Sequence, residues 1–213
     1  QNRRTISLDG KWNIIVDPFL NGYFNYRLAP SDNGYFKNAK PRSKTDLVEY
    51  DFDKSPVINV PGDWNTQMKE LYYYEGTVWY KKSFNYEKSM DRAFVYFGAV
   101  NYHAIVYVNG EKIGEHTGGF TPFNFEVTDK VKDGTNTLIV GVSNTRWGDG
   151  IPGKVTDWFN YGGITRDVRL VAVDQTFIRD YYIQLAKGSA NKVAGWVQVD
   201  GQDIPEKVDV SIE

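Results

Sequence analysis

The chain has 213 residues, no cysteine and a formal net charge of −2 at pH 7. The absence of cysteine excludes disulfide bonds, thiol catalysis and cysteine–zinc sites. The 25 basic and 27 acidic residues leave no basic surplus that would favour a nucleic acid or an anionic membrane as partner. No apolar run approaches the length of about 18 residues that is needed to span a bilayer.

Short β-branched and aromatic runs, separated by turn residues, predict many strands and no amphipathic helix. In chain order, the predicted strands of the first part are 11–16, 56–60, 77–84, 92–97, 103–108, 111–116, 123–127, 136–142 and 168–173. Asn109-Gly110 is the strongest hairpin signal. Residues 17–55 show no sustained periodicity and are interpreted as a long loop or insertion. This pattern is typical of an antiparallel sandwich or jelly roll.

Two of the predicted strands, 92–97 and 103–108, are apolar on both faces, which suits strands that are covered on two sides. In the strand at 136–142, Leu138, Val140 and Val142 share one face.

A domain boundary is expected near Asp174-Gln175. Residues 1–174 then form the jelly-roll sandwich, and residues 175–213 begin a second β domain. This second part contains three predicted strands (177–186, 193–200 and 207–212), too few to close a sandwich of their own. We therefore expect a truncated domain whose open apolar face, including Ile183 and Leu185, packs on the jelly roll or on a neighbouring chain.

The segment from Asp157 to Gly163 places a carboxylate and an amide among aromatic rings, next to a Gly-Gly turn. A sugar offers hydroxyl groups to such an acceptor and C–H faces to such rings. The same residues could instead form a plain strand-loop-strand corner, because aromatic side chains in loops usually pack. Trp64, Trp147 and Trp158 fall in predicted turns or loops and are candidates for stacking on sugar rings, whereas Trp79 is expected in the core.

No catalytic constellation is evident. Glycoside hydrolysis needs two carboxylates that flank one bond, and only Asp149 and Asp157 share a Gly-rich segment, with Asp149 more typical of a solvated loop acid. His103 and His116 flank the predicted hairpin without a third ligand, so no metal site is expected. The sequence has no nucleophile elbow, P-loop or dinucleotide fingerprint, and no cofactor is expected.

An ordered set of short motifs between Leu8 and Val173 is more specific. The motifs are Leu8-Asp9-Gly10-Lys11-Trp12, Val60-Pro61-Gly62-Asp63-Trp64, Val78-Trp79-Tyr80, Val106-Tyr107-Val108-Asn109-Gly110, Gly114-Glu115-His116-Thr117-Gly118-Gly119-Phe120-Thr121-Pro122-Phe123 and Asn160-Tyr161-Gly162-Gly163-Ile164-Thr165-Arg166-Asp167-Val168. Together they resemble the amino-terminal sugar-binding jelly-roll domain, galactose-binding-like in fold, of glycoside hydrolase family 2. That family contains β-galactosidases, β-glucuronidases and β-mannosidases, and the tail resembles the start of its immunoglobulin-like second domain.

The resemblance implies a retaining exo-β-glycosidase whose two catalytic glutamates lie on a following (β/α)₈ barrel, so this chain alone is expected to be inactive. It also implies that the jelly roll lends a loop to the glycone pocket of that barrel, with Asp157 touching sugar hydroxyls. Thr77 stands where relatives often carry a second contact, an Asn. With Trp147, Trp158, Asn160 and Tyr161, these two residues form the predicted substrate-binding set. The run Asp-Trp-Phe-Asn-Tyr-Gly-Gly-Ile looks closer to the β-glucuronidase version than to that of the large β-galactosidases.

The expected partners are a β-linked glycoside, the protein's own barrel and, in addition, a second copy in a homo-oligomer. Two other functions stay open: a stand-alone carbohydrate-binding module, in which Trp147, Trp158 and Asp157 form a complete site, and a structural domain that supports the barrel. No signal peptide is present, but the start at Gln1 looks processed. Together with the expected carbohydrate substrate, this start favours an extracytoplasmic location, periplasmic or secreted.

Overall fold

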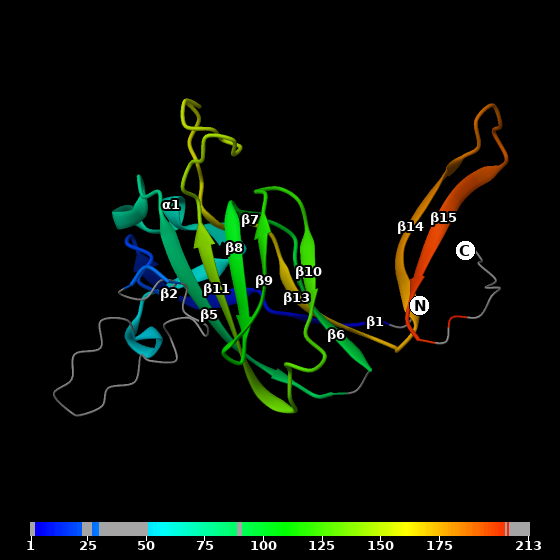
Figure 1. Ribbon diagram of the computed structural model, residues 1–213, viewed down its shortest axis with the longest axis horizontal. Coiled ribbons are helices and arrows are strands. Elements are labelled where there is room, and N and C mark those ends of the chain that lie inside the picture. Colours follow the sequence, from blue (N-terminus) through cyan, green and yellow to red (C-terminus); the bar gives the residue numbers. More distant parts are fainter. Residues whose placement is uncertain (1–2, 23–26, 30–50, 89–90, 203, 205–213) are drawn as a thin grey trace.

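Two antiparallel sheets packed face to face form the body of the computed structural model, which describes residues 3–22, 27–29, 51–88, 91–202 and 204 (Figure 1). The larger sheet has six strands in the order β3-β2-β5-β11-β8-β9, and the smaller has four in the order β1-β13-β6-β10. A short three-stranded sheet, in the order β4-β12-β7, joins three segments that are distant in sequence. The fold is all-β, as predicted.

The strand bounds are as follows. The larger sheet consists of β3 (Val57–Val60), β2 (Gly10–Asp17), β5 (Thr77–Tyr86), β11 (Gly134–Ser143), β8 (His103–Val108) and β9 (Glu111–Thr117). The smaller sheet consists of β1 (Arg3–Ser7), β13 (Val168–Val173), β6 (Arg92–Phe97) and β10 (Phe123–Glu126). The short sheet is made by β4 (Gly62–Asp63), β12 (Gly163–Ile164) and β7 (Val100–Asn101), and the helical turns are η2 (Phe52–Lys54), α1 (Trp64–Gln67) and η3 (Lys69–Leu71).

The main core lies between the two large sheets and follows the alternation of side chains along each strand. Leu138, Val140 and Val142 of β11 all lie in this core, as predicted. On β8, alternate residues face the core, while Ile105 and Tyr107 join a second buried cluster with Trp79 on the outer face of the larger sheet. The prediction that β8 is covered on both faces is therefore confirmed.

The short helix α1 was not predicted, and it changes the role of Trp64. Asp63 caps the helix by accepting a hydrogen bond from the Thr66 amide at 2.7 Å. The Trp64 side chain is fully buried, its indole N–H donates to the Tyr74 carbonyl at 3.2 Å, and its ring packs against Tyr80. The hypothesis that Trp64 stacks on a sugar is therefore wrong, because the helix turns its ring into the core.

Much of the predicted long loop at 17–55 lies outside the described residues, apart from η2 near its end. The described part of the chain contains no helix that is both long and apolar enough to cross a bilayer. The predicted strand at 207–212 also lies outside the described residues.

The tail forms a hairpin of β14 (Phe177–Leu185) and β15 (Val193–Asp200), which projects away from the sandwich (Figure 1). Among the described residues, its contacts with the sandwich lie at its base: Phe177 packs on Phe94, and Arg92 bridges Glu126 and Asp200. Arg3 donates to the Ile178 carbonyl, and Arg179 donates to Asn124. Ile183 and Leu185 keep 38% and 61% of their surface exposed. The expectation that the jelly roll covers this face is therefore wrong for these two residues, because the contacts stop near the base of the hairpin.

Candidate functional site

The loop that carries Asp157 leaves the larger sheet after β11 and returns to the short sheet at β12. It rises beyond the end of the sandwich, where it is the yellow segment at the top of Figure 1. Five of the six predicted site residues lie on this loop, and the sixth, Thr77, begins the adjacent strand β5.

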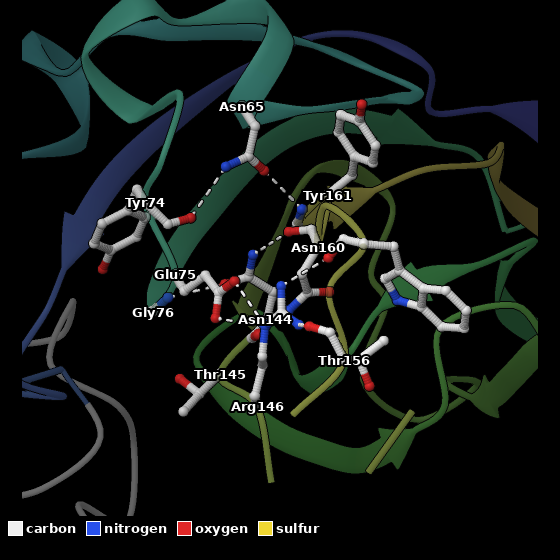
Figure 2. A network of polar contacts seen from close by, with 12 residues as sticks. Asn65, Tyr74, Glu75, Gly76, Asn144, Thr145, Arg146, Thr156, Asn160 and Tyr161 are labelled. Atoms are coloured by element: carbon white, nitrogen blue, oxygen red, sulfur yellow. Dashed lines mark hydrogen bonds and ion pairs between the residues drawn. The ribbon is translucent and has the colours of Figure 1, made fainter. Parts of the chain in front are cut away.

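Two buried asparagines close the base of this loop (Figure 2). The Asn144 side-chain amide donates to the Asn160 carbonyl at 2.8 Å, and the Asn160 amide donates back to the Asn144 carbonyl. Asn144 Oδ1 also accepts a hydrogen bond from the Gly76 amide at 2.9 Å. The two ends of the loop, 16 positions apart in sequence, are therefore fixed to one another and to the start of β5.

Two further asparagines extend the network into the sandwich. Asn101 Nδ2 donates to Asn160 Oδ1 at 3.0 Å. Asn65 accepts a hydrogen bond from the Gly162 amide at 2.8 Å, and its own amide donates to three carbonyls of the following segment, those of Leu71, Tyr72 and Tyr74.

Residue 162 has to be glycine, because a Cβ there would lie 2.0 Å from the buried Trp64 ring. The end of the loop is thus held by both backbone and side-chain groups.

Arg146 fixes the backbone on each side of Asp157. Its guanidinium donates to the carbonyl of Thr156 at 2.6 Å and to that of Trp158 at 2.9 Å. Its Nε is held by both oxygens of Glu75, at 2.9 and 3.1 Å (Figure 2). The Asp157 carboxylate itself is exposed and forms no hydrogen bond or ion pair with any residue that the structure describes. The backbone of Asp157 is therefore positioned while its oxygens stay available to a ligand.

The predicted site residues divide between two hollows. Asp157, Trp158 and Asn160 line a hollow of about 220 Å³ together with Tyr73, Glu75, Arg146 and Phe159. Thr77 and Trp147 line a separate hollow of about 440 Å³. Tyr161 lines neither, but its half-exposed ring packs on Phe159 with 4.7 Å between centroids.

Two of these residues are nearly buried, and one of them, Asn160, has its side chain occupied by the protein. Asn160 is 5% exposed. Its side-chain oxygen accepts a hydrogen bond from Asn101, and its side-chain nitrogen donates one to the Asn144 carbonyl. Thr77 is also 5% exposed, and its carbonyl accepts a hydrogen bond from the Tyr74 hydroxyl at 2.9 Å. Asn160 and Thr77 are therefore better placed to support the loop than to contact a ligand directly.

Sequence reasoning missed Arg146, Glu75 and an aromatic rim made by Tyr72 and Tyr73. Tyr73 is 84% exposed, and Tyr72 contacts Phe159 with 5.3 Å between ring centroids. The run of three tyrosines at 72–74 was the one signal that could have drawn attention to this rim. No group of three or more metal-binding side chains occurs within the part of the chain that the structure describes.

The family model for the sugar-binding domain of glycosyl hydrolases family 2 matches residues 5–174. The chain belongs to this family. Among curated relatives, a putative β-glucuronidase of Formosa agariphila is 35% identical over 141 residues, which cover 63% of this chain and 17% of that protein. A β-galactosidase of Thermoanaerobacter pseudethanolicus is 34% identical over 158 residues, which cover 69% of this chain and 21% of that protein.

Solved structures of β-glucuronidases share the fold. The enzyme from an uncultured Clostridium species superposes with a TM-score of 0.73 at 28% identity, over 94% of this chain and 34% of its own. The Faecalibacterium prausnitzii enzyme gives a TM-score of 0.73 at 26% identity, over 95% and 37%. The chain therefore spans about a fifth of the length of these curated relatives and about a third of that of the solved enzymes. The predicted family and its β-sandwich domain are confirmed, and the domain belongs to a type found in much longer glycosidases.

Proposed function

We propose that the protein carrying this chain is a retaining exo-β-glycosidase, in which this domain contributes Asp157 to a glycone pocket completed by a catalytic barrel. The observation that carries the proposal is the Asp157 carboxylate, which has no partner among the described residues and lies on a projecting loop whose backbone Arg146 holds on both sides. A fixed carboxylate can accept two sugar hydroxyls without first releasing a partner of its own. Hydrogen bonds to a charged acceptor contribute about 1.5–3 kcal/mol each.

The domain supplies binding and orientation rather than bond cleavage. Retaining hydrolysis requires an acid and a nucleophile on opposite sides of the glycosidic bond. Glu75 is the second carboxylate in the smaller hollow, but both of its oxygens accept from Arg146. Glu75 is therefore a positioning residue, and the catalytic pair has to come from another domain. We expect the 213-residue chain alone to release no product from an aryl β-glycoside.

The substrate class in this proposal is a β-linked glucuronide or galactoside, in line with the names of the relatives. Arg146 does not recognise a uronate carboxylate, because Glu75 and two carbonyls already occupy its guanidinium. If the substrate is a glucuronide, the group that binds its carboxylate lies outside this domain. Trp158 and Tyr73, at 58% and 84% exposed, provide ring faces beside Asp157.

Three wider expectations belong to the same proposal. The segment 175–213 opens a second, immunoglobulin-like domain. The hairpin of this segment has exposed large side chains, which include Tyr181, Leu185 and Trp196. We expect them to pack against the rest of the protein or against a second copy. The location is extracytoplasmic, which fractionation of the native host tests directly.

The decisive experiment measures kcat/KM of the full-length protein on aryl β-glucuronides and β-galactosides. Asp157→Ala should lower kcat/KM about a hundredfold, equivalent to about 2.7 kcal/mol, with little change in Tm. The matched control is Asp129→Asn, an exposed acid elsewhere on the sandwich, which should leave both values unchanged. A large fall in Tm with near-normal kcat/KM would instead make Asp157 a structural residue of its own loop.

A further inference from the structure

The larger hollow lies on the outer face of the six-stranded sheet, on the side opposite the main core. Its floor is made of two neighbouring cross-strand rows of β5, β11, β8 and β9, which face the same way because side chains alternate along each strand. One row is apolar and consists of Trp79, Gly141 and Ile105. The next row is polar and consists of Thr77, Ser143, His103 and Thr117.

Gly141 gives this floor its shape. A Cβ at this position would lie 2.9 Å from the Trp79 ring, so glycine allows the indole to lie across the neighbouring strand. The ring is fixed there, because its N–H donates to the buried Asp17 carboxylate at 2.9 Å. The bottom of the hollow is therefore rigid and apolar, but Trp79 is only 1% exposed, so the accessible ring face of the hollow has to come from elsewhere.

The wall comes from the loop after β11. Trp147 lines the hollow and keeps 53% of its surface exposed. Asp149, two residues further on, and Tyr102 also line it, and neither the Asp149 carboxylate nor the Tyr102 hydroxyl has a hydrogen-bond partner among the described residues. The Trp147 indole thus lies beside the floor together with a carboxylate and a phenol that no described residue bonds.

This arrangement matches the chemistry of a pyranose ring. Such a ring has C–H faces that lie on aromatic surfaces such as the exposed Trp147 indole, and hydroxyls at its edge that exchange hydrogen bonds with groups such as Ser143, Thr117 and Asp149. A volume of about 440 Å³ falls within the range of small-molecule sites. A negatively charged sugar suits the hollow less well, because its carboxylate would approach the Asp149 carboxylate, which lines the hollow.

We propose that this hollow is a second carbohydrate-binding site, which takes one neutral pyranose unit and is separate from the hollow at Asp157. The two hollows share no lining residue, although the adjacent residues Arg146 and Trp147 line one each. The site is formed by this chain alone, so it does not depend on the proposed glycone pocket or on a catalytic domain.

Titration of the full 213-residue chain by NMR or calorimetry tests the proposal. The probes are methyl β-D-galactopyranoside and methyl β-D-glucopyranoside, with methyl β-D-glucuronide as the anionic probe. At least one neutral glycoside should bind saturably, and the glucuronide should bind at least about tenfold more weakly. Trp147→Ala should weaken binding at least about tenfold, whereas Trp147→Phe, which keeps an aromatic face, should retain most of it.

The matched control is Trp158→Ala, which removes a similarly exposed indole from the same loop but from the other hollow. It should change the affinity by less than about twofold. Loss of binding in Trp158→Ala instead of Trp147→Ala would move the sugar to the Asp157 hollow and overturn the proposal. Absence of saturable binding by both neutral glycosides, or equal binding of the glucuronide, would overturn it as well. None of these outcomes affects the kinetic test of Asp157 in the full-length protein.

Discussion

Asn144 and Asn160 each donate a side-chain hydrogen bond to the other's backbone carbonyl, which joins the two ends of the loop that carries Asp157. Both side chains are buried, at 0% and 5% exposed. Removing one partner therefore leaves buried polar groups of the other without hydrogen bonds, at a cost of about 1–3 kcal/mol for each group. The precision of the candidate site depends on residues that need not touch a ligand.

Asn160→Ala should lower the free energy of unfolding by about 2–3 kcal/mol, because it removes the acceptor of Asn101 and the donor to the Asn144 carbonyl. Asn144→Ala should have a similar effect. The double variant should lose less than the sum of the two, with a coupling of about 1 kcal/mol measured by urea denaturation. Additive losses would contradict this coupling and show that the two bonds hold the loop ends independently.

Arg146→Lys should loosen the backbone around Asp157, because a lysine ammonium cannot reproduce the planar fork that reaches Glu75 and two carbonyls. Backbone ¹⁵N relaxation reports the change: the order parameters of residues 156–158 should fall from about 0.85 to below about 0.6. The control is Arg166→Lys, which donates a single bond to the Phe120 carbonyl elsewhere. Unchanged order parameters in Arg146→Lys would show that the asparagines alone fix the loop.

The sequence predicted the strands better than the site. The strands β6, β8 and β13 occupy the predicted ranges. Buried residues lie on both faces of β6 and β8, whereas β13 keeps Arg169 exposed on one face. The strand β1 was missed because Arg3-Arg4-Thr5-Ile6-Ser7 is largely polar and exposed. The two-residue strands β4, β7 and β12 are too short to leave any periodic signal.

Long-range pairing explains what was missed at the site. The motif that contains Asp157 drew attention to this loop, but the contacts of Arg146 depend on how the loop folds back on itself. Glu75 lies 71 positions away from Arg146 in sequence, so no local pattern could join them. Trp64 was assigned to a turn because Val60-Pro61-Gly62 precedes it, whereas the cap by Asp63 starts a helix there.

His103 should make the protein less stable below neutral pH. Burial among Glu115, Lys112 and His116 lowers the pKa of His103 below its ordinary value of 6.5, despite the opposing effect of Glu115. As the pH falls from 6.5 to the folded-state pKa, the unfolded chain binds more protons than the folded chain, so the free energy of unfolding decreases. His103→Gln should flatten this decrease, as measured by denaturation at a series of pH values. An unchanged slope would contradict a partly buried imidazole whose pKa is lowered in the folded chain.

Arg92 should control how firmly the hairpin of β14 and β15 is attached. Its guanidinium forms two bonds to Glu126, at 2.9 and 2.8 Å, and one to Asp200 at 3.0 Å, and it lies 5.1 Å from the centre of the Phe177 ring. Arg92→Met keeps an apolar contact with the ring but loses all three charged bonds. Cleavage within 175–202 at low protease should then become at least about tenfold faster, while the sandwich stays intact, because opening of the hairpin costs less free energy.

Low pH should weaken the attachment of the hairpin of β14 and β15 to the sandwich. The hydrogen bond from Arg92 lowers the pKa of Glu126 below its ordinary 4.5, so this contribution is complete above pH 4.5 and is lost as the pH falls through the folded-state value. Cleavage of the native hairpin should therefore accelerate in that acid range with an acid-stable protease such as pepsin, and the acceleration should be smaller in Arg92→Met. Arg169→Met is the matched control, since Arg169 pairs with Asp167 on the sandwich and has no bond to the hairpin among the described residues. Equal cleavage rates in the native chain and in Arg92→Met would show that the ring contact of Phe177 with Phe94 holds the hairpin without the charged bonds.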